Sequence, residues 1–169
     1  MDVPYVKQNA STGDCLLVHG TNTVQEGIEV ATDSSFCHAA LLVQTPVGLM
    51  VAEMVEGTGF QSMSFDDWLS NRPTDIVFYG LAPDVVRANG DRIIDSLKEY
   101  EDADKREYGY GELFEVWLSQ FTEDKYPAKH EVCSLLVQHR WEIAGYPIQG
   151  MASPGSFLYL CQLVAKIVR

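Results

Sequence analysis

The sequence predicts an α+β fold, in which a few antiparallel strands have helices before and after them. Short apolar segments bounded by turn residues, typical of strands, recur between residues 15 and 80. Segments with apolar residues at helical spacing follow, the clearest from Glu131 to Gly145. No repeat, low-complexity segment or linker interrupts the 169 residues, so we expect one domain, residues 1–169.

Composition and charge exclude some functional classes for this protein. The chain is 46% apolar and 21% charged, which is ordinary for a soluble globular protein. Its 24 acidic and 12 basic residues give a net charge of −12, which argues against binding to nucleic acid or anionic membranes. No apolar run approaches membrane-spanning length, and no signal peptide follows Met1. We therefore expect a cytoplasmic protein, or one delivered by a phage or as an effector.

The first half of the chain is expected to supply most of the sheet. Residues 1–12 have no regular pattern, and Gly13-Asp14 then leads into the first strand. Ser64 precedes a short helical segment and is a suitable N-cap. Besides the hairpin described next, the expected elements are strands over Cys15–His19, Phe60–Met63 and Asp75–Gly80, and helices over Val24–Thr32 and Ser64–Leu69.

Two neighbouring apolar segments, His38–Thr45 and Leu49–Glu56, predict a β-hairpin. If the last residue of the first strand pairs with Gly48, then Glu53 lies diagonal to His38 on the same face. Diagonal neighbours are about 7–8 Å apart at Cα, within reach of long side chains. A slip of one residue would move Glu53 to the opposite face. The sequence leaves both registers open.

The second half of the chain is expected to be mainly helical. Polar residues between Glu99 and Asp104 are expected to form a solvated face, and Lys166 and Arg169 suit a helix C-terminus. The expected helices cover Pro83 to about Asp104, Glu112–Ser119, Glu131–Gly145 and Gly155–Val168.

The helix from Glu131 to Gly145 carries Cys133 in its first turn. Its wide apolar face predicts deep packing, and Gly145 is the expected stop signal. Free N–H groups and the positive end of the helix dipole favour a thiolate there, and the same groups could stabilise an oxyanion. The alternative is that Cys133 only fills the core.

A cysteine nucleophile needs a base and a group that orients the base. His38, at the start of a strand, is the candidate base, and Glu53, on the partner strand, is the candidate orienting group, expected at Nδ1 of the imidazole. The alternative is that the histidine is structural and the glutamate is solvated.

The order of these features resembles the permuted NlpC/P60 papain-like proteins, and within them the YiiX/YebB-like branch. The similarity extends over most of residues 13–160. It is carried by Gly13-Asp14, Cys37-His38-Ala39-Ala40-Leu41-Leu42-Val43, Val51-Ala52-Glu53-Met54 and Val132-Cys133-Ser134-Leu135-Leu136-Val137, with weaker matches at Tyr108, Tyr110 and Ser153-Pro154-Gly155.

The resemblance implies a role for three residues. Cys133 matches the nucleophile, and His38 matches the base, although Cys37 stands where the family usually has Ser. Glu53 matches the third polar residue, although Met54 stands where Ala is common. The implied fold is a circularly permuted papain-like core, and the implied activity is that of a cysteine hydrolase that works through an acyl-enzyme.

The resemblance leaves three functions open. The first is an amidase or peptidase acting on peptidoglycan-type or isopeptide bonds. The second is a lipid acyltransferase or thioesterase, and the third is a catalytically silent binding scaffold. The expected partner is thus a peptide, muropeptide or acyl substrate, with no cofactor, and the oligomeric state is left open.

The remaining cysteines and histidines are expected to be structural. Cys15, Cys37 and Cys161 lie in apolar patterns that predict packing. His130 is expected on the surface, and His19 and His139 are expected to be structural. A zinc site built from Cys37, His38, His130 and Cys133 is conceivable, but its spacing matches no common zinc pattern.

Overall fold

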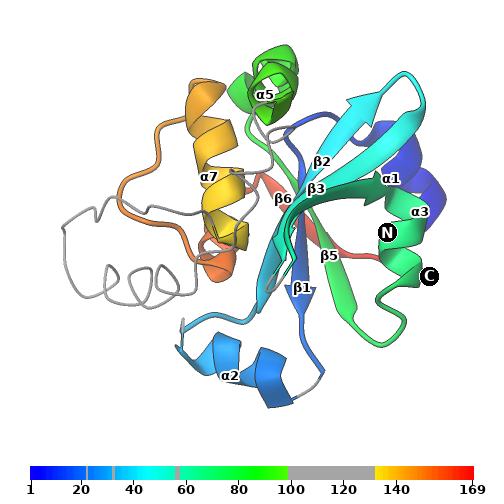
Figure 1. Cartoon of the computed structure of the whole chain (residues 1–169), viewed down its shortest axis with the longest axis vertical. Coiled ribbons are helices and arrows are strands. Elements are labelled where there is room, and N and C mark those ends of the chain that lie inside the picture. The colour runs from blue at the N-terminus through cyan, green and yellow to red at the C-terminus, as the bar shows by residue number, and fades with distance from the viewer. Residues whose placement is uncertain (22, 32, 56–57, 99–131) are drawn as a thin grey trace.

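A six-stranded antiparallel sheet forms the centre of the protein. The computed structural model describes residues 1–21, 23–31, 33–55, 58–98 and 132–169 (Figure 1). Within them the strand order is β4-β3-β2-β1-β5-β6. The strands are β1 Cys15–His19, β2 His38–Thr45, β3 Gly48–Val55, β4 Gly59–Ser64, β5 Ile76–Leu81 and β6 Leu163–Lys166.

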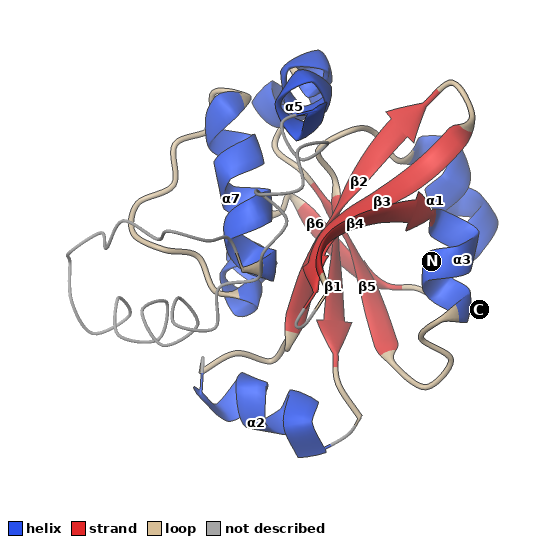
Figure 2. Cartoon of the chain, in the orientation of Figure 1, coloured by secondary structure: helices blue, strands red, loops and turns tan. Residues whose placement is uncertain are grey.

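Helices cover both faces of this sheet. Figure 2 shows α5 and α7 on one side and α1 and α3 on the other, with α2 below the strand ends. The helices are α1 Val3–Asn9, α2 Thr23–Ala31, α3 Phe65–Ser70, α4 Asp84–Ala88, α5 Gly90–Leu97, α7 Cys133–Ile143 and α8 Phe157–Leu160. The expected α+β class is therefore confirmed. No helix in the described ranges has the length and apolar character needed to cross a membrane.

Alternating residues of the strands build two separate cores. Leu17 and Leu41 face α7 and pack with its Trp141. Leu16 and Leu42 face the other way and pack with Trp68 of α3. Both sheet faces are thus buried, which is why these strands have nearly continuous apolar sequences rather than alternating ones.

The β2–β3 hairpin has the first of the two registers that the sequence left open. Thr45 pairs with Gly48, and Leu41 pairs with Ala52 further along the ladder. Gly48 has φ +125°, a backbone conformation that glycine adopts without strain. This register keeps Glu53 on the same face of the sheet as His38.

Gly13 and Asp14 lie at a crossing of several elements. Gly13 has φ +104°, and a Cβ there would lie 2.6 Å from Val86 Cγ1 of α4. The Gly13 carbonyl accepts a 2.8 Å hydrogen bond from the Trp141 indole. The buried Asp14 carboxylate accepts hydrogen bonds from the Tyr79 hydroxyl and the Ala82 backbone N–H. The Gly-Asp pair therefore joins β1 to β5, α4 and α7.

The first residues form a helix where the sequence predicted an irregular segment. Asp2 caps α1 by accepting a 2.9 Å hydrogen bond from Tyr5 N–H, and Pro4 stands in the first turn, where its missing N–H costs nothing. Only Val6 of this helix is buried, so its apolar pattern is too short to be recognised in the sequence.

The helix predicted from Pro83 to about Asp104 is broken. It divides into α4 and α5 at Asn89, which leaves the helical conformation with φ −114° and ψ 28°. Gly90 follows because a Cβ there would lie 2.9 Å from Thr12 Cβ. The segment from Glu99 to Asp104, and the helix predicted over Glu112–Ser119, lie outside the described residues.

The prediction of a helix over Gly155–Val168 is wrong. A single turn at Pro154–Ser156 and the short α8 are followed by strand β6. β6 pairs with β5, so that Gly80 lies opposite Val164. The edge of β5 offers unpaired backbone groups, and pairing with them outweighs the weak helical preference of this segment. Lys166 consequently lies in a strand and not at a helix end.

Candidate functional site

Helix α7 places Cys133 at its first turn, as predicted. Val132 is the N-cap and contributes no side-chain hydrogen bond, so the first N–H groups of the helix stay available. Gly145, with φ +96°, follows the end of the helix. Eight of its eleven residues are buried, and Cys133 itself is 3% exposed. The helix is held on nearly every side, which fixes the position of the sulfur.

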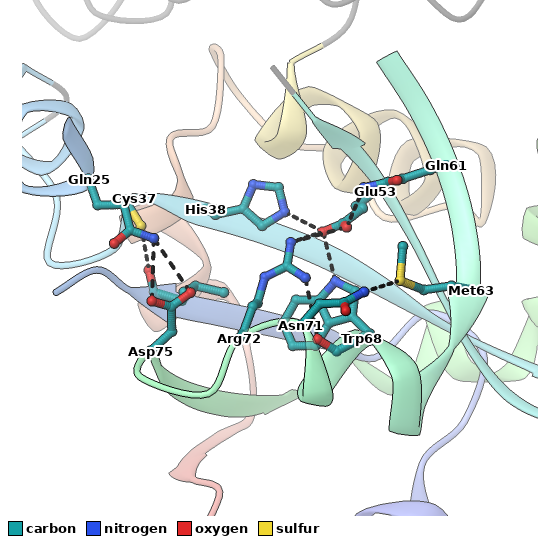
Figure 3. A network of polar contacts seen from close by, with 11 residues as sticks. Gln25, Cys37, His38, Glu53, Gln61, Met63, Trp68, Asn71, Arg72 and Asp75 are labelled. Carbon is teal, nitrogen blue, oxygen red and sulfur yellow. Dashed lines mark hydrogen bonds and ion pairs between the residues drawn. The ribbon is translucent and has the colours of Figure 1, made fainter. Parts of the chain in front are cut away.

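His38 and Glu53 meet across the hairpin. His38 Nε2 lies 2.7 Å from Glu53 Oε2 (Figure 3). The contact engages Nε2, whereas the sequence analysis expected the carboxylate at Nδ1. This difference leaves Nδ1 as the ring nitrogen available to the thiol.

Cys133 lies close enough to His38 for each residue to act on the pKa of the other. The charge of His38 and a hydrogen bond with it act on the Cys133 thiol, as do the backbone N–H groups of Ala39 and Ser134. The structure therefore brings all three predicted residues together, with His38 acting on both the carboxylate and the thiol.

Glu53 has more partners than the sequence indicated. Its carboxylate is fully buried and accepts hydrogen bonds from Gln61 Nε2 at 3.0 Å, Trp68 Nε1 at 2.8 Å and Arg72 at 2.9 Å (Figure 3). The Arg72 guanidinium also stacks over the Trp68 ring, 4.1 Å from its centroid. These contacts fix the carboxylate that holds His38.

Sequence reasoning missed these three supporting residues. Gln61 lies opposite Glu53 in the β3–β4 ladder, so it could have been found only once that register was known. Trp68 offered a signal, since a buried indole needs an acceptor for its N–H. Arg72 follows the end of α3, where nothing in the sequence indicates the direction of its side chain.

The surroundings of Glu53 keep it ionised. Burial alone would raise the pKa of the carboxyl, but the hydrogen bond and charge of His38, followed by the charge of Arg72 and the Trp68 N–H, lower that pKa to about 2. A permanent negative charge thus stands behind the imidazole at any physiological pH.

The same electrostatics favour an ion pair between His38 and Cys133. Burial would lower the pKa of His38, but the charge and hydrogen bond of Cys133 and those of Glu53 raise it to about 9. Burial would raise the pKa of Cys133, but the charge and hydrogen bond of His38 and the two backbone N–H groups lower it. The two shifts act together, so each charged form stabilises the other and the balance moves towards a thiolate and an imidazolium.

Comparisons with known proteins give only a faint relationship. The sequence matches no known protein family and no curated protein. One solved structure with a similar course of the chain is the metalloprotein YiiX from Escherichia coli O157:H7. It is 14% identical with a TM-score of 0.48, over 94% of this chain and 97% of that one. This likeness is too weak to carry an argument about the fold or the chemistry.

Metal ligands do not gather in the described part of the chain. Within residues 1–21, 23–31, 33–55, 58–98 and 132–169, no group of three or more His, Cys, Asp or Glu side chains is arranged to hold a metal ion. His130, a member of the conceivable zinc set, and Tyr108 and Tyr110, which took part in the resemblance, lie outside these residues.

The other cysteines lie away from the reactive pair or point elsewhere. Cys37 is buried in the core on the α3 side, and its thiol donates to the Val18 carbonyl at 3.3 Å. Burial raises the pKa of Cys37 to about 12, so this thiol stays protonated. Cys15 is fully buried and Cys161 partly exposed. The packing expected for Cys37 and Cys15 is confirmed.

Two of the other histidines also have structural positions. His19 Nδ1 lies 2.9 Å from Glu29 Oε1, which links the end of β1 to α2. His139 is half-buried on α7. The contact of His19 agrees with its structural interpretation, and that of His139 stays a prediction.

Proposed function

We propose that the protein is a cysteine hydrolase that works through an acyl-enzyme, with Cys133 as nucleophile, His38 as base and Glu53 as orienting group. The observation that carries this proposal is the position of His38, which contacts the buried carboxylate of Glu53 and shifts the pKa of Cys133 downwards. A structural histidine in a core has no need of an ionised partner on each side.

The proposed reaction begins with the preformed ion pair. The Cys133 thiolate attacks the substrate carbonyl, and backbone N–H groups at the start of α7 stabilise the oxyanion. His38, as imidazolium, donates its proton to the leaving group, and Glu53 keeps the ring oriented throughout. His38 then activates water, which releases the acyl group from the sulfur.

The order of the elements supports a permuted papain-like arrangement. The histidine strand β2 precedes the cysteine helix α7 by about half the length of the chain. The resemblance to the permuted NlpC/P60 proteins agrees with this order and favours an amide in a peptidoglycan-type or isopeptide substrate. We therefore take amidase or peptidase activity as the first candidate.

An apolar groove whose lining packs against Leu136 of α7 favours an acyl substrate as the second candidate. Its volume is about 360 Å³, and it lies between α5 and the strands β2 to β4. Apolar lining comes from Met50, Phe60 and Leu97. Phe60 and Leu97 also pack against Met54 of β3 and against Leu136 of α7. Leu136 lies one helical turn after Cys133. A hydrocarbon chain suits such a surface.

The first experiment tests whether Cys133 is reactive. Iodoacetamide labelling of the full chain at pH 7, followed by peptide mapping, should label Cys133 faster than free cysteine, because only the thiolate reacts. Cys37 is the internal control and should stay unlabelled in the folded protein. If Cys133 reacts no faster than free cysteine, the silent scaffold becomes the better interpretation.

The second experiment tests turnover. Muropeptides, isopeptide-linked peptides and nitrophenyl esters of increasing chain length are offered to the wild type, Cys133→Ala, His38→Ala and the matched control Cys37→Ala. We expect the first two variants to lose activity by at least about 10³-fold while remaining folded, and Cys37→Ala to retain it. Preference for long-chain esters over amides would favour the acyl candidate, and full turnover by Cys133→Ala would refute the nucleophile.

A further inference from the structure

Two thiols outside the proposed site lie in contact. Cys15 Sγ and Cys161 Sγ are 3.3 Å apart, although 146 positions separate the residues in sequence. Cys15 belongs to β1 and is completely buried, whereas Cys161 follows α8 and is partly exposed. Cys161 is therefore the residue of this pair that lies nearer to solvent, and the sulfur of Cys15 is in contact with its sulfur.

A glycine provides the space in which the two sulfurs meet. Gly80 of β5 lies opposite Cys15 in the β1–β5 ladder. A Cβ at Gly80 would lie 2.6 Å from Cys161 Sγ and 2.7 Å from Cys15 Sγ. Any side chain there would push the sulfurs apart, so the contact depends on the absence of one. A disulfide requires the sulfurs to approach by about 1.2 Å more, a shift within the range of small side-chain rotations.

We propose that Cys15 and Cys161 are a thiol pair that a small-molecule disulfide, such as oxidised glutathione, converts into an intramolecular disulfide. The Cys161 thiolate attacks one sulfur of the oxidant, forming a mixed disulfide and releasing one thiolate. Cys15 then loses its proton and attacks Cys161 Sγ, which releases the second thiolate. Overall, two protein thiols and one disulfide oxidant give one protein disulfide and two small thiols.

The burial of Cys15 sets the order and the speed of these steps. The hydrogen bond with Cys161 and burial raise the pKa of the Cys15 thiol. Cys15 thus cannot react first with an oxidant in solution, but it becomes the resolving thiol once Cys161 carries a good leaving group. The second step should be slow and should accelerate as the pH rises.

The bond would join the centre of the sheet to its far edge. It would link β1 to the segment that leads into β6 and would close a loop of nearly the whole chain, which restricts the unfolded state strongly. The oxidised protein should therefore melt about 5–10 °C higher than the reduced protein. This inference does not depend on the proposed hydrolase activity, because Cys133 takes no part in it.

The experiment is oxidation of the full chain. The reduced protein is incubated with oxidised glutathione, remaining thiols are blocked, and peptides are mapped by mass spectrometry without reduction. We expect a peptide pair joined through Cys15 and Cys161, with the loss of two hydrogens and complete reversal by dithiothreitol. Cys37→Ala, which removes a buried thiol outside the pair, should give the same linked peptides.

Two variants make the result decisive. Cys15→Ser should stop the reaction at a stable glutathione adduct on Cys161, and Cys161→Ser should leave Cys15 unmodified, with no rise in melting temperature in either case. A wild type that stops at the glutathione adduct would overturn the proposal. So would a linkage between other cysteines, such as Cys37 and Cys133, in place of this pair.

Discussion

Two buried carboxylates, Asp14 and Glu53, have similar surroundings but differ in one partner. Both are completely buried, and each lies beside an arginine at the meeting point of several elements. Asp14 accepts hydrogen bonds from two backbone N–H groups and the Tyr79 hydroxyl. None of these donors changes its protonation near neutral pH, so Asp14 is a structural junction.

Glu53 differs because one of its partners is an imidazole. His38 changes its charge within the range of pH in which enzymes work, and it connects the carboxylate to Cys133. The comparison teaches that burial and full hydrogen bonding do not distinguish a structural carboxylate from one that we propose to take part in catalysis. The distinction lies in whether a titratable partner leads on to a reactive group.

The largest expected effect follows from Glu53→Gln. Arg72 and His38 would lose their common counter-charge, so we expect the free energy of unfolding to fall by about 3–5 kcal/mol. Because the imidazolium loses its support, alkylation of Cys133 at pH 7 should slow by at least about tenfold. Urea denaturation and iodoacetamide kinetics measure the two effects.

A matched control exists for that change. Glu29→Gln removes the other histidine–carboxylate pair, between Glu29 and His19, and should leave the reactivity of Cys133 unaltered. Unchanged alkylation in folded Glu53→Gln protein would mean that Glu53 is a second junction like Asp14.

Asp14→Asn should separate stability from reactivity. The substitution keeps the shape but removes the charge that accepts hydrogen bonds from Tyr79 and Ala82, so we expect a loss of about 2–3 kcal/mol in the free energy of unfolding. The alkylation rate of Cys133 in the folded variant should stay within about twofold of the wild type. A tenfold change would show that the two carboxylates are coupled.

The pH dependence of alkylation and hydrolysis should also distinguish Asp14 from Glu53. Alkylation of Cys133 should rise through an inflection below the usual thiol pKa, since the pKa of Cys133 is lowered. Hydrolysis should fall above about pH 9, as His38 loses the proton that the leaving group needs, by about tenfold per pH unit. Asp14→Asn should change neither the rise of alkylation nor the fall of hydrolysis with pH. Glu53→Gln should move the fall of hydrolysis to lower pH.

The same pKa shifts predict how stability depends on pH. The raised pKa of His38 gives a contribution that is complete below pH 6.5 and is lost as the pH rises through about 9. The lowered pKa of Glu53 gives a contribution that is present above pH 4.5 and is lost as the pH falls through about 2. Thermal melts at different pH values should therefore show that the His38–Glu53 pair stabilises the protein most between pH 4.5 and 6.5. A stabilisation by this pair that grew above pH 9 would contradict the ion pair.

The smallest expected effect is that of Tyr79→Phe. It removes one donor to Asp14 and should lower the free energy of unfolding by about 1 kcal/mol, or the melting temperature by about 2–4 °C. Tyr5→Phe, at a position 46% exposed, is the control and should change neither value. An equal loss in both variants would remove the distinction between the buried and the exposed hydroxyl.

Much of the fold could be predicted because short-range signals decide it. The strand Cys15–His19, the presence of the β2–β3 hairpin and the Ser64 cap all agree with their local sequence. The sequence left two hairpin registers open, and only the register with Thr45 opposite Gly48 places Glu53 on the same face as His38.

The errors arose where a distant partner decides the structure. The segment after Cys161 forms a strand only because the edge of β5, more than eighty residues earlier, is free to pair. The break between α4 and α5 depends on the close approach of Gly90 to Thr12. Arg72 and Trp68 belong to the site because α3 packs under Glu53, and no local pattern contains that information.

The near-complete burial of α7 has a consequence for how the protein fluctuates. A helix enclosed on this scale cannot detach by itself, so its amide hydrogens should exchange with deuterium only when the whole molecule opens. The lifetime of the arrangement around the sulfur is then the lifetime of the native state itself.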